Sequence, residues 1–229
     1  MTDLPQGDVP GTDSAPRPRL AASVILLRDA PGGLEAFVQH RVSTMDFAAG
    51  MVVFPGGRVD AADHDGWEYP AELLQRHADD WHLSSIGTDH TQAAKNAGTV
   101  LTAAIREVRE EAGLSIRATS LRPWANWITP TDMPKRFDTY FYVAHPAPGD
   151  EPQHQTTEAW QSLWMPVDGI LAAEAAGTLK LMPPTYFLLK EMAALGSVER
   201  VWSEDHAVVP VLAGPGSMAA FLKARENRG

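Results

Sequence analysis

The sequence contains no cysteine, and this absence excludes disulfide bonds, zinc–thiolate sites and a cysteine nucleophile. Its apolar runs are also short, with four residues at 24–27 and at 51–54, whereas a membrane-spanning helix needs about 20. Residues 1–19 carry three aspartates and no apolar run, so they do not have the pattern of a secretory signal. Together these features predict a cytoplasmic protein without a membrane segment.

Positive charge is scarce as well. The chain has 19 Lys and Arg against 29 Asp and Glu, a formal net charge of −10 at pH 7. An acidic surface repels a phosphate backbone, which argues against general nucleic-acid binding. Half of the acidic excess lies in residues 58–98, where eight acidic and three basic residues give a balance of −5. Where no spacing supports more, such a run of charge indicates a solvated surface.

The length of 229 residues favours one domain, or one domain with a large insertion, over two domains. Residues 1–19, with four prolines and two glycines, are predicted to be a disordered arm in front of a folded domain over 20–229. Strands are predicted over residues 22–27 and 36–40, as a hairpin, and over 51–54, 124–129, 139–144, 162–165 and 208–212. Helices are predicted over residues 70–77, 89–112, 167–176 and 184–195. This order of elements is typical of a mixed α/β fold.

The helix that ends near residue 112 carries a cluster of acidic residues. Its apolar positions, which define a buried face, are Leu101, Ile105, Val108 and Ala112. Glu107, Glu110 and Glu111 stand at i, i+3 and i+4, so their side chains converge on a different face, near the helix end where the dipole favours cations. A divalent cation would relieve this repulsion, and oxygen ligands suit Mg²⁺ or Mn²⁺. The spacing alone leaves a solvated acidic face open as the alternative.

The wider sequence around these glutamates carries a family pattern. Residues 106–114, Arg-Glu-Val-Arg-Glu-Glu-Ala-Gly-Leu, resemble the second half of the Nudix box, and all seven positions that the pattern specifies match. Gly56-Gly57, at the end of a predicted strand, is similar to the glycine pair that opens the box. The resemblance implies a Nudix α/β/α sandwich with a mixed sheet and a helical insertion.

The spacing within the box departs from the family pattern. Arg106 lies 49 residues after Gly57, whereas the family usually places this arginine fourteen residues after the glycine, so residues 58–98 form an insertion inside the box. The position eight residues before the arginine, where the family usually has glutamate, is Gly98. In the family pattern the glutamate also lies six residues after the glycine that opens the box, and in this sequence that position is Asp63. The role of Asp63 is left open. We expect the insertion either to govern substrate choice or to act as a packing or dimerisation element.

Other stretches resemble a narrower group. Arg41, Gly50 and residues 54–57 keep the spacing of the upstream signature of coenzyme A diphosphatases, although Val42 and Asp46 stand where that signature has a small residue and an arginine. Residues 126–130 and 136–139 are similar to the peroxisomal-type relatives, which also carry long insertions in the box. The resemblance covers roughly residues 20–195.

The resemblance implies hydrolysis of a diphosphate bond in a nucleoside diphosphate linked to another group, with Mg²⁺ or Mn²⁺ as cofactor. Coenzyme A or an acyl derivative is the first candidate substrate, and other dinucleotides, nucleotide sugars and modified nucleoside triphosphates stay open. A Nudix-fold module that binds or regulates through a nucleotide without cleaving it is the alternative. A small-molecule nucleoside diphosphate is the expected partner, and a homodimer is left open.

The resemblance also assigns roles to individual residues. The implied metal ligands are Glu107, Glu110, Glu111 and the backbone carbonyl of Gly57. The implied catalytic set is Arg106, which orients the glutamates, with Glu107, Glu110 and the late acidic residue Glu158. An ordinary ion pair on the helix surface is the alternative for Arg106, and a surface glutamate is the alternative for Glu158. Arg41 and Arg136 are expected to bind substrate, and a salt bridge to Asp132 or Asp138 is the alternative for Arg136.

Two further groups of side chains are predicted to be structural. The aromatic residues Trp124, Trp127 and Phe137 are expected in the core, with stacking on a base as the alternative. The histidines of the insertion show no zinc-ligand spacing with any thiol and are expected at the surface; they are His64, His77, His82 and His90.

Overall fold

The predicted hairpin forms around a tight turn at Pro31-Gly32, between β1 (Arg19–Ala30) and β2 (Gly33–Arg41). The computed structural model describes residues 15–43, 48–147 and 149–226. The predicted disordered arm lies mostly outside these residues, and Arg19 at its end already belongs to β1.

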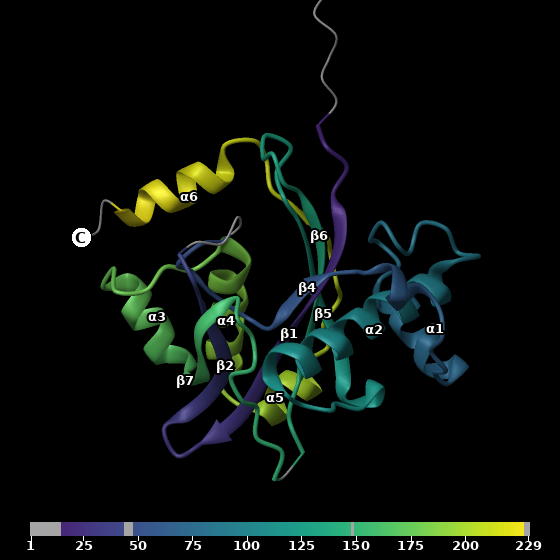
Figure 1. Cartoon of the computed structure of the whole chain (residues 1–229), viewed down its shortest axis with the longest axis horizontal. Helices are drawn as coiled ribbons and strands as arrows, with labels where there is room; N and C mark the ends of the chain where they lie inside the picture. The colour runs from purple at the N-terminus through teal and green to yellow at the C-terminus, as the bar shows by residue number, and fades with distance from the viewer. Residues whose placement is uncertain (1–14, 44–47, 148, 227–229) are drawn as a thin grey trace, which may run out of the picture.

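A mixed sheet of eight strands forms the middle layer of the molecule (Figure 1). The other strands are β3 (Val52–Val53), β4 (Gly56–Arg58), β5 (Leu121–Ile128), β6 (Phe137–Ala144), β7 (Ala159–Pro166) and β8 (Val211–Leu212). Their order is β3-β2-β1-β6-β5-β8, with β4 paired to β1 and β7 paired to β2. The β1–β6 and β5–β8 pairs are parallel and the others antiparallel, so the predicted mixed sheet is confirmed.

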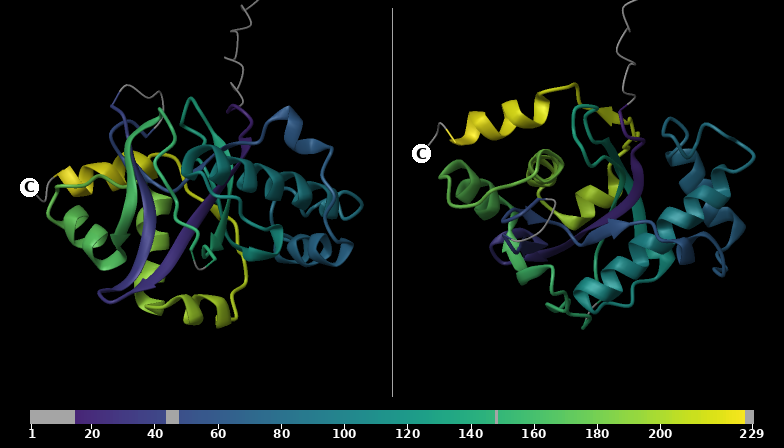
Figure 2. Two further views of the ribbon diagram at one scale, coloured as in Figure 1. Left: turned by 60° about the horizontal axis from the view of Figure 1, so that its bottom comes forward. Right: turned by 45° about the horizontal axis from the view of Figure 1, so that its top comes forward.

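Helices cover both faces of the sheet (Figure 2). They are α1 (Ala71–Asp80), α2 (Ala93–Ala112), α3 (Val167–Ala175), α4 (Pro183–Leu195), α5 (Val198–Ser203) and α6 (Ser217–Glu226), with short 3-10 turns at Ala61–His64 and Ala118–Ser120. Because side chains alternate along β1, Val24 and Leu26 pack with α1 and α2, whereas Ile25 and Leu27 pack with α3 and α4. The two apolar cores give the predicted α/β/α layers.

Several predicted elements have different bounds in the structure. Helix α2 begins at Ala93, not near Asp89, because the Asp89 carboxylate accepts hydrogen bonds from the backbone and hydroxyl of Thr91 in a turn before the helix. It ends, as predicted, at Gly113, which adopts a left-handed conformation with φ 66°. The late strand is limited to β8, and helices α5 and α6 were not predicted.

The insertion is part of the core. The Trp81 side chain is fully buried and packs edge-on against the rings of Tyr140 and Tyr142, with ring centroids 5.0 and 5.5 Å apart. The Ser85 hydroxyl donates a 2.5 Å hydrogen bond to buried Asp138 on β6. His77 on α1 is also buried, so the prediction that it lies at the surface is wrong.

The other three histidines of the insertion are exposed, as predicted. Among the described residues, no helix is long and apolar enough to cross a membrane.

Candidate active site

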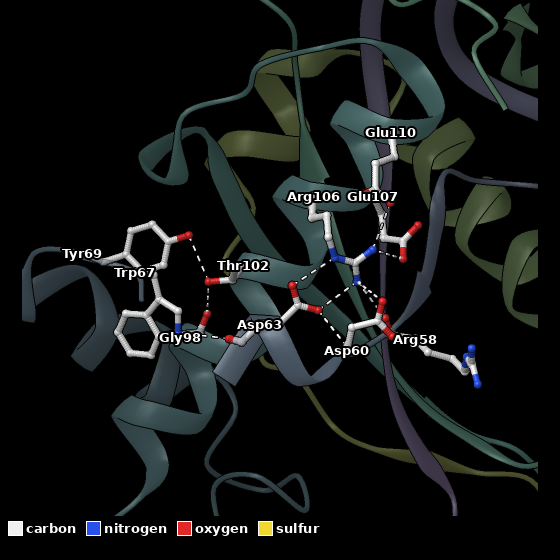
Figure 3. Close-up of polar contacts among 10 residues, drawn as sticks. All are labelled: Arg58, Asp60, Asp63, Trp67, Tyr69, Gly98, Thr102, Arg106, Glu107 and Glu110. Carbon is white, nitrogen blue, oxygen red and sulfur yellow. Dashed lines mark hydrogen bonds and ion pairs between the residues drawn. The ribbon is translucent and has the colours of Figure 1, made fainter. Parts of the chain in front are cut away.

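Arg106 on α2 joins the helix to the loop that follows β4 (Figure 3). Its Nε and Nη2 donate to the two carboxylate oxygens of Asp63 at 3.0 and 2.8 Å, and Nη2 also donates to the Arg58 carbonyl at 2.9 Å. Its Nη1 donates to Glu107 at 2.7 Å and to Glu110 at 3.2 Å. The guanidinium thus contacts both glutamates, which is the position that the orienting role expected of Arg106 requires.

Asp63 is the carboxylate that pairs with this arginine, and it is only 1% exposed. Burial raises the pKa of Asp63, but the hydrogen bonds from Arg106 and the Asp60 backbone and the Arg106 charge outweigh this, so the net pKa is lowered. The hydrogen bond to Asp63 is in turn the main reason that the pKa of Arg106 is raised. The position six residues after Gly57, and not position 98, therefore supplies the acidic partner.

Gly57 lies directly against the Glu107 carboxylate, and any other residue at position 57 would displace this carboxylate. A Cβ on Gly57 would lie 2.7 Å from Cδ of Glu107. Next to this contact, the backbone N–H of Gly56 donates to Oε2 of Glu111 at 2.9 Å. The glycine pair thus places backbone directly against the two glutamates that the sequence predicted as metal ligands.

The two glutamates are buried, with Glu107 9% and Glu111 6% exposed. Burial raises the pKa of both, and that of Glu111 to about 7. The charges of Glu107 and Glu158 add to the shift of Glu111, whereas the Gly56 N–H opposes it. Two repelling carboxylates in a region poor in water are an arrangement that a cation stabilises.

Glu158 lies near this pair and is held by Arg41. Nη2 of Arg41 donates to Oε2 of Glu158 at 2.8 Å, at the point where β2 ends and β7 begins. The Val42 backbone N–H also donates to the Glu158 carbonyl at 3.0 Å. The structure therefore brings Arg41 and Glu158, which are 117 residues apart in sequence, to the same place as the helix glutamates.

The chemistry of these residues fits a divalent cation only in part. Glu107, Glu111 and the backbone of Gly57 provide oxygen donors of the kind that Mg²⁺ and Mn²⁺ prefer. The third predicted ligand, Glu110, is half exposed and turned toward Arg106. Among the described residues, no group of three or more His, Asp or Glu side chains is arranged to hold a metal ion by itself.

A cavity of about 1020 Å³ opens beside the glycine pair. Of the predicted site residues, its wall includes Arg41, Gly57, Glu107, Arg136 and Glu158, but not Arg106, Glu110 or Glu111. The wall also has an apolar part, formed by Trp127, for which stacking on a base was the stated alternative, and by four residues that were not predicted, Met182, Phe187, Met218 and Phe221. Residues 61–98 of the insertion do not line the cavity, which favours a packing role for this segment.

Arg136 and two of the three predicted aromatic residues line the cavity, whereas the third, Trp124, lies in the core. Within the described part of the chain, Arg136 forms no ion pair with Asp132 or Asp138; it donates to the carbonyls of Thr129 at 3.1 Å and Pro16 at 2.8 Å. Trp124 is buried in the core, as predicted. Trp127 instead stacks on Phe187 with centroids 5.8 Å apart, and both Trp127 and Phe137 line the cavity.

Comparisons with known proteins identify a domain type and similar folds. A family model described as NUDIX domain matches residues 72–184, a range that includes the three helix glutamates but not the glycine pair. The crystal structure of a NUDIX hydrolase from Alicyclobacillus acidocaldarius is similar, with 24% identity and a TM-score of 0.65 over 83% of this chain and 98% of that chain. The NUDIX domain of Shewanella oneidensis NrtR, in complex with ADP ribose, is similar with 13% identity and a TM-score of 0.52 over 78% and 88%. No curated protein matches the chain in sequence.

Proposed function

Because this chain carries a Nudix domain, we propose that it is a Nudix-type pyrophosphohydrolase that cleaves a diphosphate bond in a nucleoside diphosphate linked to another group. One observation carries the proposal: buried Glu107 and Glu111 lie against Gly57 and Gly56 beside a cavity of about 1020 Å³. This arrangement combines a candidate cation site with space for a substrate.

Glu107, Glu111 and the Gly57 carbonyl are the residues that would hold Mg²⁺ or Mn²⁺. When bound, the cation would neutralise diphosphate charge and activate a water molecule. Arg106 acts as a positioning residue, because its bonds to Asp63 and Glu107 tie the loop after β4 to the helix. Glu110 stays a proposed outer member of the cluster, reached through Arg106.

Glu158 and Arg41 have complementary parts in this proposal. The Glu158 carboxylate is half exposed and lines the cavity, so it can accept a proton from water there. Arg41 holds Glu158 in position and lines the same wall, where its remaining donors can contact a phosphate. Arg136, with no carboxylate partner among the described residues, is a second phosphate contact.

Coenzyme A or an acyl derivative is the proposed substrate. The similarity of residues 41–57, 126–130 and 136–139 to coenzyme A diphosphatases supports it. The apolar part of the cavity supports it as well, since a long arm without phosphate could pack on Phe187 and Phe221. ADP ribose, which the similar NrtR domain binds, belongs to the same chemical class and is the first alternative to compare.

A binding module without turnover is the second candidate. The observation that favours it is that no three carboxylates of the described residues are arranged to hold a metal. Such a module would use the same cavity and its basic side chains to bind a nucleotide, but it would release no product.

One experiment separates the two candidates. The protein is incubated with coenzyme A, an acyl-coenzyme A, ADP ribose, a nucleotide sugar and a dinucleoside polyphosphate, each with Mg²⁺, with Mn²⁺ or with chelator, and products are separated by chromatography. Metal-dependent cleavage of the diphosphate supports the hydrolase: coenzyme A would give adenosine 3′,5′-bisphosphate and a phosphopantetheine, and ADP ribose would give AMP and ribose phosphate. Tight binding in calorimetry without products supports the module. Cytoplasmic location and a homodimer stay predictions from the sequence.

A further inference from the structure

The cavity wall has a charge opposite to that of the whole chain. The net charge of the protein is −10. The cations that line the cavity are Arg17, Arg19, Arg41, Arg58, Lys135 and Arg136, whereas the acidic residues that line it are Asp60, Glu107 and Glu158. Positive charge is therefore concentrated where a substrate would lie.

Three of these arginines are brought together by strand pairing. Arg19 lies opposite Phe137 in the parallel β1–β6 pair, and its backbone N–H donates to the Arg136 carbonyl at 3.0 Å. Arg58 on β4 lies opposite Ala21, two residues along β1 from Arg19. Arg19 on β1, Arg58 on β4 and Arg136, which directly precedes β6, thus line the same cavity, and below they are called the arginine group.

The arginine group has free hydrogen-bonding capacity. Within the described part of the chain, the side chains of Arg19 and Arg58 form no ion pair or hydrogen bond, and that of Arg136 donates only to two carbonyls. In Figure 3 the Arg58 side chain points away from the carboxylates that surround Arg106, although its own carbonyl is bound there. Unpaired guanidinium groups on a cavity wall are suited to a phosphate, which they bind in a planar, bidentate geometry.

Within the arginine group, Arg58 directly follows Gly57 and lies opposite Ala21, whereas Arg19 is displaced further from the glutamates along β1. Gly56, which contacts Glu111, lies opposite Ser23, four residues from Arg19. Four residues of strand span about 13 Å, which exceeds the length of a diphosphate and is closer to that of a nucleotide. A substrate whose diphosphate lies at Glu107 can therefore place a second anionic group near Arg19, where the side chain of Arg58 can also turn toward it.

We infer that the arginine group binds a phosphate monoester on the nucleoside half of the substrate, separate from the diphosphate that is cleaved. This inference rests on the proposed function, because it takes the cavity to be the substrate site. It predicts that the preferred substrates are nucleoside diphosphate derivatives with an additional phosphate on the ribose.

The test uses pairs of compounds that differ only in this phosphate: coenzyme A with dephospho-coenzyme A, and NADP⁺ with NAD⁺. We expect the phosphorylated member to have a kcat/KM at least about tenfold higher, as is typical of charge-assisted hydrogen bonds. In the double variant Arg19→Gln/Arg58→Gln the ratio should fall toward 1, while kcat/KM for dephospho-coenzyme A changes by less than about threefold. Arg117→Gln, at an exposed arginine outside the cavity, is the matched control and should keep the ratio.

Three outcomes would overturn the inference. The first is a ratio near 1 in the unmodified protein. The second is an equal loss for both members of a pair in the double variant, which would place the arginines at the cleaved diphosphate. The third concerns a protein that cleaves none of the compounds, a result that refutes the proposed hydrolase but leaves the phosphate site to be tested by binding. In that case the inference is overturned if adenosine 3′,5′-bisphosphate binds no more tightly than AMP in calorimetry. If the double variant does not fold, the single variants replace it.

Discussion

The ring of Trp67 lies against Gly98, in the space that a side chain at position 98 would occupy. A Cβ on Gly98 would be 2.5 Å from Cζ2 of the indole. The Trp67 Nε1–H donates to the Asp63 carbonyl at 3.1 Å, so the same indole also supports the residue that pairs with Arg106. Trp67 of the insertion thus explains why α2 has a glycine at position 98. Asp63 of the insertion supplies the acidic partner of Arg106 that position 98 does not provide.

Gly98→Ala should destabilise the protein. In a helix interior this change usually stabilises by roughly 0.5–1 kcal/mol. Here the added methyl group would overlap with Trp67, and overpacking of this kind costs about 1–3 kcal/mol. Urea unfolding of the single variants and of Gly98→Ala/Trp67→Ala gives the test. Gly98→Ala should become neutral or stabilising when Trp67 is absent, and a stabilising effect in the unmodified protein would contradict the packing described.

Asp63→Asn should lower the free energy of unfolding by about 3 kcal/mol, because it breaks a bidentate pair whose acidic member is buried. Asp60→Asn is the matched control. The Asp60 carboxylate is exposed and lies 4.0 Å from Nη2 of Arg106, so its loss should cost less than about 1 kcal/mol. Equal effects of the two variants on urea unfolding would remove the special role of Asp63.

Glu111→Gln should reduce metal-dependent turnover by about 10²-fold or more, the size expected when a group that stabilises developing charge is removed. The fold should persist, since the amide oxygen can still accept the hydrogen bond from Gly56. Stability without metal should not fall, because a buried charge and its repulsion with Glu107 are removed. Rates are measured with saturating Mg²⁺ and Mn²⁺, and a rate near that of the unmodified protein would refute the metal-site assignment.

His77 should make stability fall at acidic pH. Burial lowers the pKa of His77 to about 4, from about 6.5 in an unfolded chain. Between these values the unfolded state binds more protons, so the free energy of unfolding decreases as pH falls from 6.5 toward 4. The loss attributable to His77 between about pH 7 and pH 5 should be about 2 kcal/mol. His77→Gln should flatten this part of the pH profile, and His82→Gln, at an exposed site, should leave it unchanged.

The parts of the site that could be predicted from the sequence are local. Glu107, Glu110 and Glu111 share a helix face because their spacing alone determines it. The glycine pair, which was predicted to end a strand, instead forms the first two residues of β4 and pairs with β1. The pairing of Arg106 with Asp63 spans 43 residues and depends on how the insertion folds, so the sequence could only leave it open. The burial of His77 did have a signal, because Leu73 lies four residues earlier on the same helix face and is also buried.

The part of the apolar cavity wall formed by Met218 and Phe221 could not be predicted, because these residues belong to α6, a helix that sequence patterns did not indicate. Helix α6 is held by contacts distant in sequence: Arg225 forms an ion pair with buried Glu174 and lies over the ring of Tyr186. Phe221 packs on Tyr186 and lines the cavity. The position of α6 therefore follows from tertiary packing alone.

Substrate choice should accordingly respond to α6 and not to residues 61–98 of the insertion, which do not line the cavity. Phe221→Ala removes an aromatic side chain from the cavity wall, so kcat/KM for an acyl-coenzyme A should fall relative to ADP ribose by about fivefold or more, the scale of a few methylene contacts. Trp81→Ala removes a buried ring from the core that the insertion forms with the sheet, and should cost about 3–5 kcal/mol of stability while the ratio stays the same. Relative rates are measured below the unfolding temperature of each variant. A change of ratio in Trp81→Ala with none in Phe221→Ala would return substrate choice to the insertion, because only a segment that reaches the bound substrate can alter one rate without the other.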